Sequence, residues 1–201
     1  MDKLKYTTYL AGPIEHATKD EMINPREDIT KELYGYKEVG IYDPIKQESE
    51  KVGKESGEQV KYIQGLKKAG RYEQFFHNMW SIWFGQINEN SDIIQVLQHL
   101  RMTKHIHGNT KAEFNCWGDA EAVVRSDFII VYLPDTKTVG THWELFLAAL
   151  FRIPAYVILP DRSKTEANST MLFGVMLSGG EVFYKIKDCT DHIKEKYNLV
   201  K

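Results

Sequence analysis

The apolar residues of this chain fall into short runs that alternate with segments of helical spacing. Most of the short runs are rich in β-branched and aromatic residues, as strands commonly are. They cover residues 6–11, 39–42, 128–133, 155–159 and 182–186. Helical spacing marks the segments 24–35, 119–125, 141–151, 169–177 and 188–197. Because strands that alternate with helices form parallel βαβ crossovers, the pattern predicts an α/β fold in which helices cover both faces of a parallel sheet.

Local signals refine the helix ends. Asn24 is a good N-cap and Pro25 is tolerated in a first helical turn, so the first helix is predicted to begin at this pair and to stop near Gly35. A hydroxyl side chain is expected to cap the helix at 169–177, and Ser91 is expected to cap a helix within a long segment that follows the second strand.

That long segment, at about 46–115, is a predicted helical insertion in a single domain that spans 1–201. It opens with a charged, mobile surface loop at 46–57, and helical spacing runs from Glu58 to about Leu100. One apolar stripe consists of Phe75, Phe76, Met79, Trp80 and Trp83. Its aromatic members and the adjacent Phe84 could stack on bases, but burial in a helical core or at an oligomer contact is the commoner use of such a cluster. Because the segment is too short for a core of its own, we predict an oligomer contact or a pocket lid.

Composition and charge exclude several classes of function. The chain has 201 residues, with 26 Lys and Arg against 28 Asp and Glu, and its formal charge is −2. Its net charge therefore does not favour binding to nucleic acid or to an anionic membrane. Two cysteines are too few for a disulfide framework or an all-thiolate zinc site, and the histidines near His99 are expected on the surface. With no apolar run of about 18 residues and no signal-peptide pattern, we expect a cytoplasmic protein without a metal.

Three loops at the expected carboxyl ends of the strands carry the candidate chemistry. They cover residues 9–16, 117–119 and 133–144. In an open parallel sheet, ligands bind in the loops that lead from a strand end into a helix. The sequence therefore places its candidate binding residues along one edge of the sheet.

Glu144 is the most informative residue of these loops, and two interpretations stay open. It follows Gly140 and Thr141 at the spacing of a capping box, so it could simply close its own helix. Alternatively, the positive end of the helix holds its carboxylate ionised, and it acts as the nucleophile of a retaining glycosyl transfer. That chemistry needs a second carboxyl group at about 5 Å. Asp119 could supply it, or could be another acid at a helix start.

Several short motifs stand in a characteristic order. Tyr-Leu-Ala-Gly-Pro follows the first strand, Asp119 lies seven residues before a Ser-Asp pair that starts an apolar strand, and Gly-Thr-x-x-Glu opens a helix that ends in Arg-Ile-Pro-Ala-Tyr-Val. Over residues 6–16 and about 117–175, this order resembles the nucleoside 2-deoxyribosyltransferase family and its nucleotide N-glycosidase relatives. The resemblance implies a flavodoxin-like or Rossmann-like fold, cleavage of an N-glycosidic bond through a glycosyl-enzyme ester, and a homo-oligomer in which a neighbouring subunit completes each pocket.

The resemblance also implies roles for single residues. Glu144 matches the nucleophile, Asp119 the acid that assists the departing base, and Tyr9 the phenol that holds the nucleophile. Thr138 stands where the family has an Asp or Asn that holds the base, and Asp135 is a nearby residue that could replace it. The remaining candidate substrate contacts are Gly12, Pro13, Gly140, Thr141, His142 and Asn168. The last of these matches, to within one residue, an Asn that the family supplies from a neighbouring subunit.

The predicted function is cleavage of the N-glycosidic bond of a nucleoside or nucleotide, with transfer of the sugar to a second base or to water. The partner is then a small molecule, and no cofactor is needed because a carboxylate and a proton donor suffice. The segment 13–16 contains a carboxylate and no arginine, which favours an unphosphorylated nucleoside. The alternative is a non-catalytic nucleotide-binding or sensor module on the same fold.

Overall fold

A parallel sheet forms the centre of the molecule. The computed structural model describes residues 4–14, 17–47, 58–104, 118–135, 138–160 and 168–201. The sheet has five strands in the order β2-β1-β3-β4-β5, and every neighbouring pair is parallel. The strands are β1 (Tyr6–Ala11), β2 (Val39–Tyr42), β3 (Phe128–Tyr132), β4 (Ala155–Ile158) and β5 (Glu181–Phe183). This is the strand order of flavodoxin-like folds, so the predicted α/β class is confirmed.

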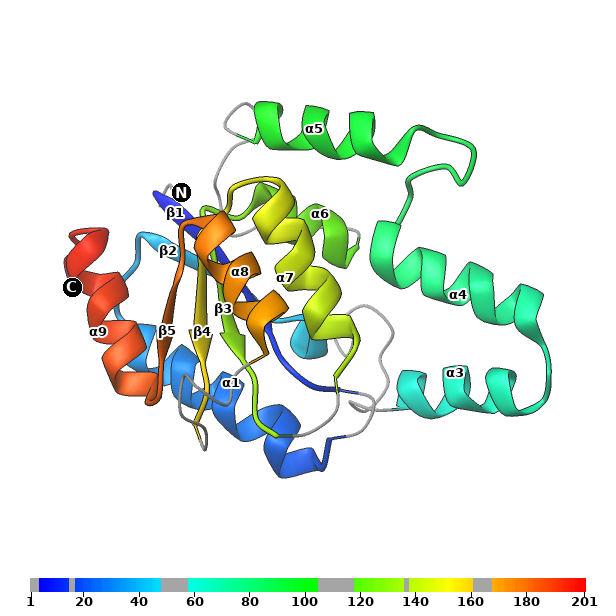
Figure 1. The fold of residues 1–201 in the computed structure, drawn as a ribbon, viewed down its shortest axis with the longest axis horizontal. Coiled ribbons are helices and arrows are strands. Elements are labelled where there is room, and N and C mark those ends of the chain that lie inside the picture. The colour runs from blue at the N-terminus through cyan, green and yellow to red at the C-terminus, as the bar shows by residue number, and fades with distance from the viewer. Residues whose placement is uncertain (1–3, 15–16, 48–57, 105–117, 136–137, 161–167) are drawn as a thin grey trace.

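Helices cover both faces of the sheet (Figure 1). One face carries α6 (Asp119–Arg125), α7 (Gly140–Leu150) and α8 (Ser169–Ser178). The other face carries α1 (Lys19–Leu33) and α9 (Ile186–Lys196). Each layer of helices encloses its own apolar core against the sheet, as the alternating pattern of the sequence predicts.

The central strand β3 serves both cores. Ile129 and Val131 belong to the core beneath α6, α7 and α8, whereas Phe128 and Ile130 belong to the core beneath α1 and α9. All four side chains are fully buried. Because successive side chains of a strand point to opposite faces, a strand between two helical layers needs a continuous apolar run.

The first helix begins earlier than predicted. The Thr18 hydroxyl accepts the Glu21 backbone N–H at 3.3 Å, and the Glu21 carboxylate accepts the Thr18 backbone N–H at 2.8 Å. This capping box satisfies the helix start at Lys19, so the prediction of a start at Asn24 is wrong, and Pro25 lies inside the helix. The proline removes one backbone hydrogen bond there, which the rest of the helix tolerates.

The other element ends agree with the sequence pattern to within a few residues, but two caps differ. The Asn168 side chain, not a hydroxyl, caps α8 by accepting the backbone N–H groups of Thr170 and Met171. Asp92 rather than Ser91 caps α5 (Ile93–Thr103). In both cases a neighbouring Asn or Asp supplies the acceptor oxygen, and these residues are at least as good N-caps as Ser.

The insertion contributes α3 (Glu58–Lys68), α4 (Tyr72–Phe84) and α5, which lie on the side of the molecule away from α9 (Figure 1). Leu97 of α5 is fully buried in the core beneath α6, α7 and α8, and Trp83 of α4 packs against that core. Phe76 of the same α4 stripe is 51% exposed. The parent domain therefore covers one part of the predicted stripe and leaves another part open.

The predicted loop at 46–57 lies mostly outside the described residues. Residues 46 and 47 are helical together with 44 and 45, so the loop does not begin at 46 as predicted. Residues 48–57 and the end of the predicted insertion, 105–115, are not described.

Candidate active site

Tyr9 and Glu144 meet near the carboxyl edge of the sheet. Tyr9 lies in β1 and is fully buried, and Glu144 lies one turn inside α7 and is 5% exposed. The Tyr9 hydroxyl donates a hydrogen bond to Glu144 Oε1 at 2.6 Å, across 135 positions of sequence. Strand order reverses between β1 and β3, and ligand sites of open parallel sheets lie at that reversal.

Glu144 does not cap its own helix. Helix α7 begins at Gly140, and its N-cap residue Val139 makes no side-chain cap bond. The Thr138 hydroxyl instead accepts the Thr141 backbone N–H at 3.3 Å. Of the two interpretations that the sequence leaves open, the capping box is therefore wrong, because the Glu144 carboxylate reaches β1 rather than the start of its helix.

Burial controls the ionisation of Glu144. Loss of hydration raises the pKa of this carboxyl from 4.5 to about 7, while the Tyr9 hydrogen bond and the Arg26 charge act in the opposite direction. The expectation that the helix start keeps the group ionised is incomplete, because the penalty of burial is larger. The second oxygen, Oε2, has no hydrogen-bond partner among the described residues. Buried oxygens without a partner are rare, and perturbed carboxyls of this kind gather at functional sites.

Tyr9 remains a hydrogen-bond donor at ordinary pH. Burial, followed by the charges of Asp119 and Glu144, raises the pKa of its hydroxyl well above 10.0. The ring of Tyr42 stacks on the Tyr9 ring at a centroid distance of 5.6 Å. Asp119 is half-buried and is the first residue of α6. Because its charge acts on Tyr9, the structure brings both predicted carboxyl groups to the neighbourhood of one phenol.

Arg26 and Asp43 are site residues that the sequence analysis missed. Arg26 is 4% exposed, and its Nη2 donates to the Gly12 carbonyl oxygen at 3.1 Å. Its Nε lies 3.5 Å from Asp43 Oδ1. Burial raises the pKa of Asp43, and the Arg26 charge opposes that shift. Arg26 thus links the end of β1 to the end of β2 and places a positive charge near Glu144.

A signal for Arg26 exists in the sequence. It stands one turn after Met22 and one turn before Ile29, both of which are buried residues of α1. A charged residue in the buried stripe of a helix needs a partner, and it therefore indicates a buried ion pair or a site. The misplaced helix start at Asn24 hid this position, because it put Arg26 in the exposed first turn.

The other predicted contacts fall into two groups. Gly12 and Pro13 are buried at the end of β1, and a Cβ on Gly12 would lie 3.3 Å from both Arg26 Nη2 and the Tyr132 carbonyl oxygen. The residues after β3 organise the start of α7: the Thr138 and Thr141 hydroxyls lie 2.6 Å apart, and the His142 ring bonds the Thr138 carbonyl oxygen. Asp135, Gly140 and His142 are exposed there. Asn168 uses its side-chain oxygen to cap α8.

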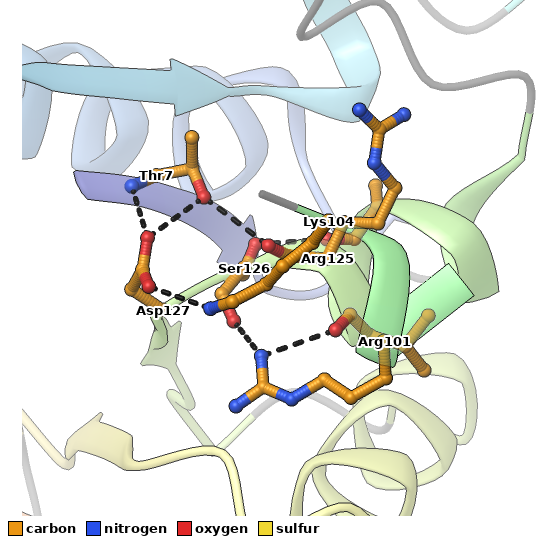
Figure 2. Close-up of polar contacts among 8 residues, drawn as sticks. Thr7, Arg101, Lys104, Arg125, Ser126 and Asp127 are labelled. Atoms are coloured by element: carbon orange, nitrogen blue, oxygen red, sulfur yellow. Dashed lines mark hydrogen bonds and ion pairs between the residues drawn. The ribbon is translucent and has the colours of Figure 1, made fainter. Parts of the chain in front are cut away.

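A second polar cluster lies at the opposite, amino edge of the sheet (Figure 2). Lys104 Nζ donates to Asp127 Oδ1 at 2.6 Å, and the Thr7 backbone N–H donates to Asp127 Oδ2 at 2.8 Å. Arg101 donates to the carbonyl oxygens of Val124 and Ser126 at 3.2 and 2.6 Å. These carbonyls end α6, so the arginine charge complements the negative end of that helix. The cluster therefore ties α5 to α6 and to β1.

Comparisons with known proteins give no family: the chain matches no protein-family model and no curated protein. Across the described ranges, no helix is long and apolar enough to cross a membrane. The same ranges contain no group of three His, Cys, Asp or Glu side chains arranged to hold a metal ion. What the site can do chemically follows from the geometry around Glu144.

Proposed function

We propose that this chain cleaves the N-glycosidic bond of a nucleoside or nucleotide, with Glu144 as the nucleophile, and passes the sugar to a second base or to water. The observation that carries the proposal is the buried Glu144 carboxylate, which has one oxygen held by Tyr9 and the other without a described hydrogen-bond partner. Such an oxygen can bond to an electrophilic carbon without first giving up a hydrogen bond. The resemblance of the surrounding motifs to nucleoside 2-deoxyribosyltransferases supports the same role.

The reaction has two balanced steps. Glu144 Oε2 bonds to C1′ of the sugar as the bond between C1′ and the base nitrogen breaks, and Asp119 delivers a proton to that base. The product is a glycosyl ester of Glu144 and a free base. A second base or a water molecule then bonds to C1′, the ester bond breaks, and the proton of the incoming group returns to Asp119.

The geometry around Glu144 assigns different tasks to its neighbours. Tyr9 holds Oε1 and leaves Oε2 for the sugar, and its high pKa keeps it a donor throughout the cycle. The Arg26 charge favours the ionised carboxylate against the cost of burial. Because the Arg26 guanidinium already binds the Gly12 carbonyl and Asp43, it acts on Glu144 through its charge. This arrangement supports a substrate without a phosphate at this position.

The proposal includes a homo-oligomer. Large apolar side chains on the adjacent helices α7 and α8 are exposed to between 49% and 78%. They are Trp143, Phe146, Leu150, Phe173 and Met176. An exposed apolar surface of this kind supports contact with a second copy of the chain beside the Glu144 helix. Sedimentation analysis of Phe146→Asp should show a shift toward monomer, whereas Tyr34→Asp, on an isolated exposed tyrosine, should not.

The decisive experiment detects the glycosyl ester. The protein is incubated with 2′-deoxynucleosides, ribonucleosides and their monophosphates, with and without a free base, and products are separated by chromatography. A 2′-fluorinated nucleoside is used in parallel to trap the ester, and intact-mass spectrometry should show one sugar adduct per chain that maps to Glu144.

Two variants make the result specific. Glu144→Gln should abolish both turnover and the adduct, whereas Glu195→Gln, at an exposed glutamate of α9, should change neither. An adduct on Asp119, or full turnover by Glu144→Gln, would contradict the assignment of the nucleophile. Tight nucleotide binding with no turnover of any compound would instead favour the non-catalytic module.

A further inference from the structure

The end of helix α4, in the insertion, lies directly on the residue that precedes Asp119. A Cβ on Gly118 would lie 2.6 Å from the Gly85 backbone nitrogen and 2.7 Å from the Trp83 carbonyl oxygen. Side-chain carbons do not approach backbone atoms so closely, so only glycine fits between the two segments. The backbone at 83–85 therefore sets where α6 begins.

The same segment also reaches the helix that carries Glu144. Trp83 Cζ2 lies 4.0 Å from the position of a Cβ on Gly140, the first residue of α7. The rings of Trp83 and Trp143 make an edge-to-face contact with centroids 6.3 Å apart. Gly140 lies one turn before Glu144 on the same face of α7, so Trp83 packs where that face begins. One short segment thus touches the starts of both carboxyl-bearing helices.

The insertion also contacts the C-terminal end of α6. Arg101 and Lys104 of the α5 end bind the last carbonyls of α6 and Asp127, as Figure 2 shows. Helix α6 is short, running from Asp119 to Arg125. A short helix held at both ends by the insertion has little freedom to shift relative to α7.

We propose that the insertion is a positioning element of the active site, in which the segment 83–85 fixes Asp119 relative to Glu144. This inference rests on the proposed function. It differs from the sequence-based expectation of a lid or an oligomer contact, because Trp83 packs against residues of its own chain. Trp83 and Gly118 are positioning residues here, acting through the two helices that they touch.

The test compares two glycine substitutions. Gly118→Ala places a methyl group against the α4 end, whereas Gly65→Ala, within α3, meets no atom within 4 Å. Displacement of Asp119 should slow nucleosides with poor leaving bases by about tenfold or more. Nucleosides with activated leaving groups, which do not need the proton from Asp119, should change by less than about twofold. Gly65→Ala should behave as the unchanged protein with both substrates.

The pattern of losses separates positioning from general damage. Equal slowing of both substrate classes by Gly118→Ala, or no slowing of either, would overturn the inference. Hydrogen exchange gives a readout that does not depend on turnover: Gly118→Ala should speed exchange of the α6 amides from Ala122 onward, which donate within the helix, and Gly65→Ala should not. If the unchanged protein turns over no nucleoside, the proposed function fails. The positioning contact is then tested by hydrogen exchange alone, and it is overturned if Gly118→Ala exchanges the α6 amides at the same rate as the unchanged protein.

Discussion

Each edge of the sheet carries a carboxylate, half-buried at the amino edge and buried at the carboxyl edge, and the two carboxylates have different partners. At the amino edge, Asp127 accepts hydrogen bonds from Lys104 and from the Thr7 backbone at 2.6 and 2.8 Å. At the carboxyl edge, Glu144 accepts one hydrogen bond from Tyr9 among the described residues, and its pKa is about 7. The first carboxylate has a cation at contact distance, and the second has a neutral phenol.

This difference is the one that the proposed function expects between a structural carboxylate, Asp127, and a reactive one, Glu144. A half-buried carboxylate with a bonded cation and a backbone donor holds elements in place, as Asp127 does for α5 and β1. A buried carboxylate with one oxygen left over costs stability in its ionised form, and proteins keep such groups where their reactivity is used. Both oxygens of Asp127 accept hydrogen bonds, whereas Glu144 Oε2 accepts none from the described residues.

Neutralising one carboxylate at each edge should give the largest difference between the two edges. Glu144→Gln should lower turnover by about a thousandfold or more, because the amide cannot form the glycosyl ester. Asp127→Asn should lower turnover by about tenfold at most (about 1 kcal/mol) while the protein is folded, because Asp127 touches no reacting atom and an asparagine oxygen can still accept a hydrogen bond from Thr7 or Lys104. Steady-state kinetics at a temperature where both variants are folded measures the two effects. A comparable loss of turnover in both variants would contradict the distinction between a reactive Glu144 and a structural Asp127.

Stability against pH gives the second effect. The folded-state pKa of Glu144 lies above its ordinary 4.5, so the folded state binds more protons than the unfolded state between about 4.5 and about 7. Stability from this group is therefore full below about pH 4.5 and is lost as pH rises to about 7. At about 1.4 kcal/mol per unit, the loss is about 3 kcal/mol.

The measurement is urea denaturation of the unchanged protein and of Glu144→Gln over this pH range. The variant should become the more stable of the two as pH rises, because glutamine does not titrate. A constant difference between the two proteins from pH 4 to pH 8 would contradict the raised pKa of Glu144.

Removing the cation at the amino edge should give a smaller change. Lys104→Met leaves Asp127 with its Thr7 bonds but without an opposite charge, and should lower the free energy of unfolding by about 2 kcal/mol. Full burial would give more, but 21% of the Asp127 side chain is exposed. Lys61→Met, at an exposed lysine of α3, is the control and should stay within about 0.5 kcal/mol. Equal denaturation midpoints for the two variants would show that the Lys104–Asp127 pair adds nothing to stability.

The fold could be predicted well because its strands are marked by composition. The run predicted at 6–11 matches β1 to the residue, and the run predicted at 128–133 extends one residue beyond β3. A strand buried on both faces favours a continuous run of apolar and β-branched side chains, which is easy to find in a sequence. The start of α1 was misplaced because Asn24 and Pro25 resemble a helix start, whereas Thr18 and Glu21 make the actual capping box. Local signals compete, and tertiary burial of α1 decided between them.

The site could be predicted only in part. Motif order pointed to Glu144, Tyr9 and Asp119, and the structure brings these three together, although their roles stay predictions. The Arg26–Asp43 pair joins different strands and helices, so no local pattern connects the two residues. The contact of Gly118 with 83–85 depends on how the insertion packs, which spacing along the chain does not encode.

The smallest effect is expected from removing the Tyr9 hydroxyl, which is the donor to Glu144 among the described residues. In the unchanged protein, the Tyr9 hydroxyl donates to Glu144 Oε1 and so lowers the pKa of Glu144. The Tyr9→Phe variant lacks this hydroxyl. The pKa of Glu144 should therefore rise further above about 7 in this variant, since a donor to the ionised form is lost. If Glu144 reacts as the carboxylate, kcat/KM rises with pH through this pKa, and the midpoint of the profile should move to higher pH in Tyr9→Phe.

Tyr156→Phe is the matched control, because Tyr156 is also buried in the sheet but its hydroxyl bonds Tyr197. A lower kcat/KM at every pH with no shift of the midpoint would mean that Tyr9 orients the carboxylate without tuning its charge.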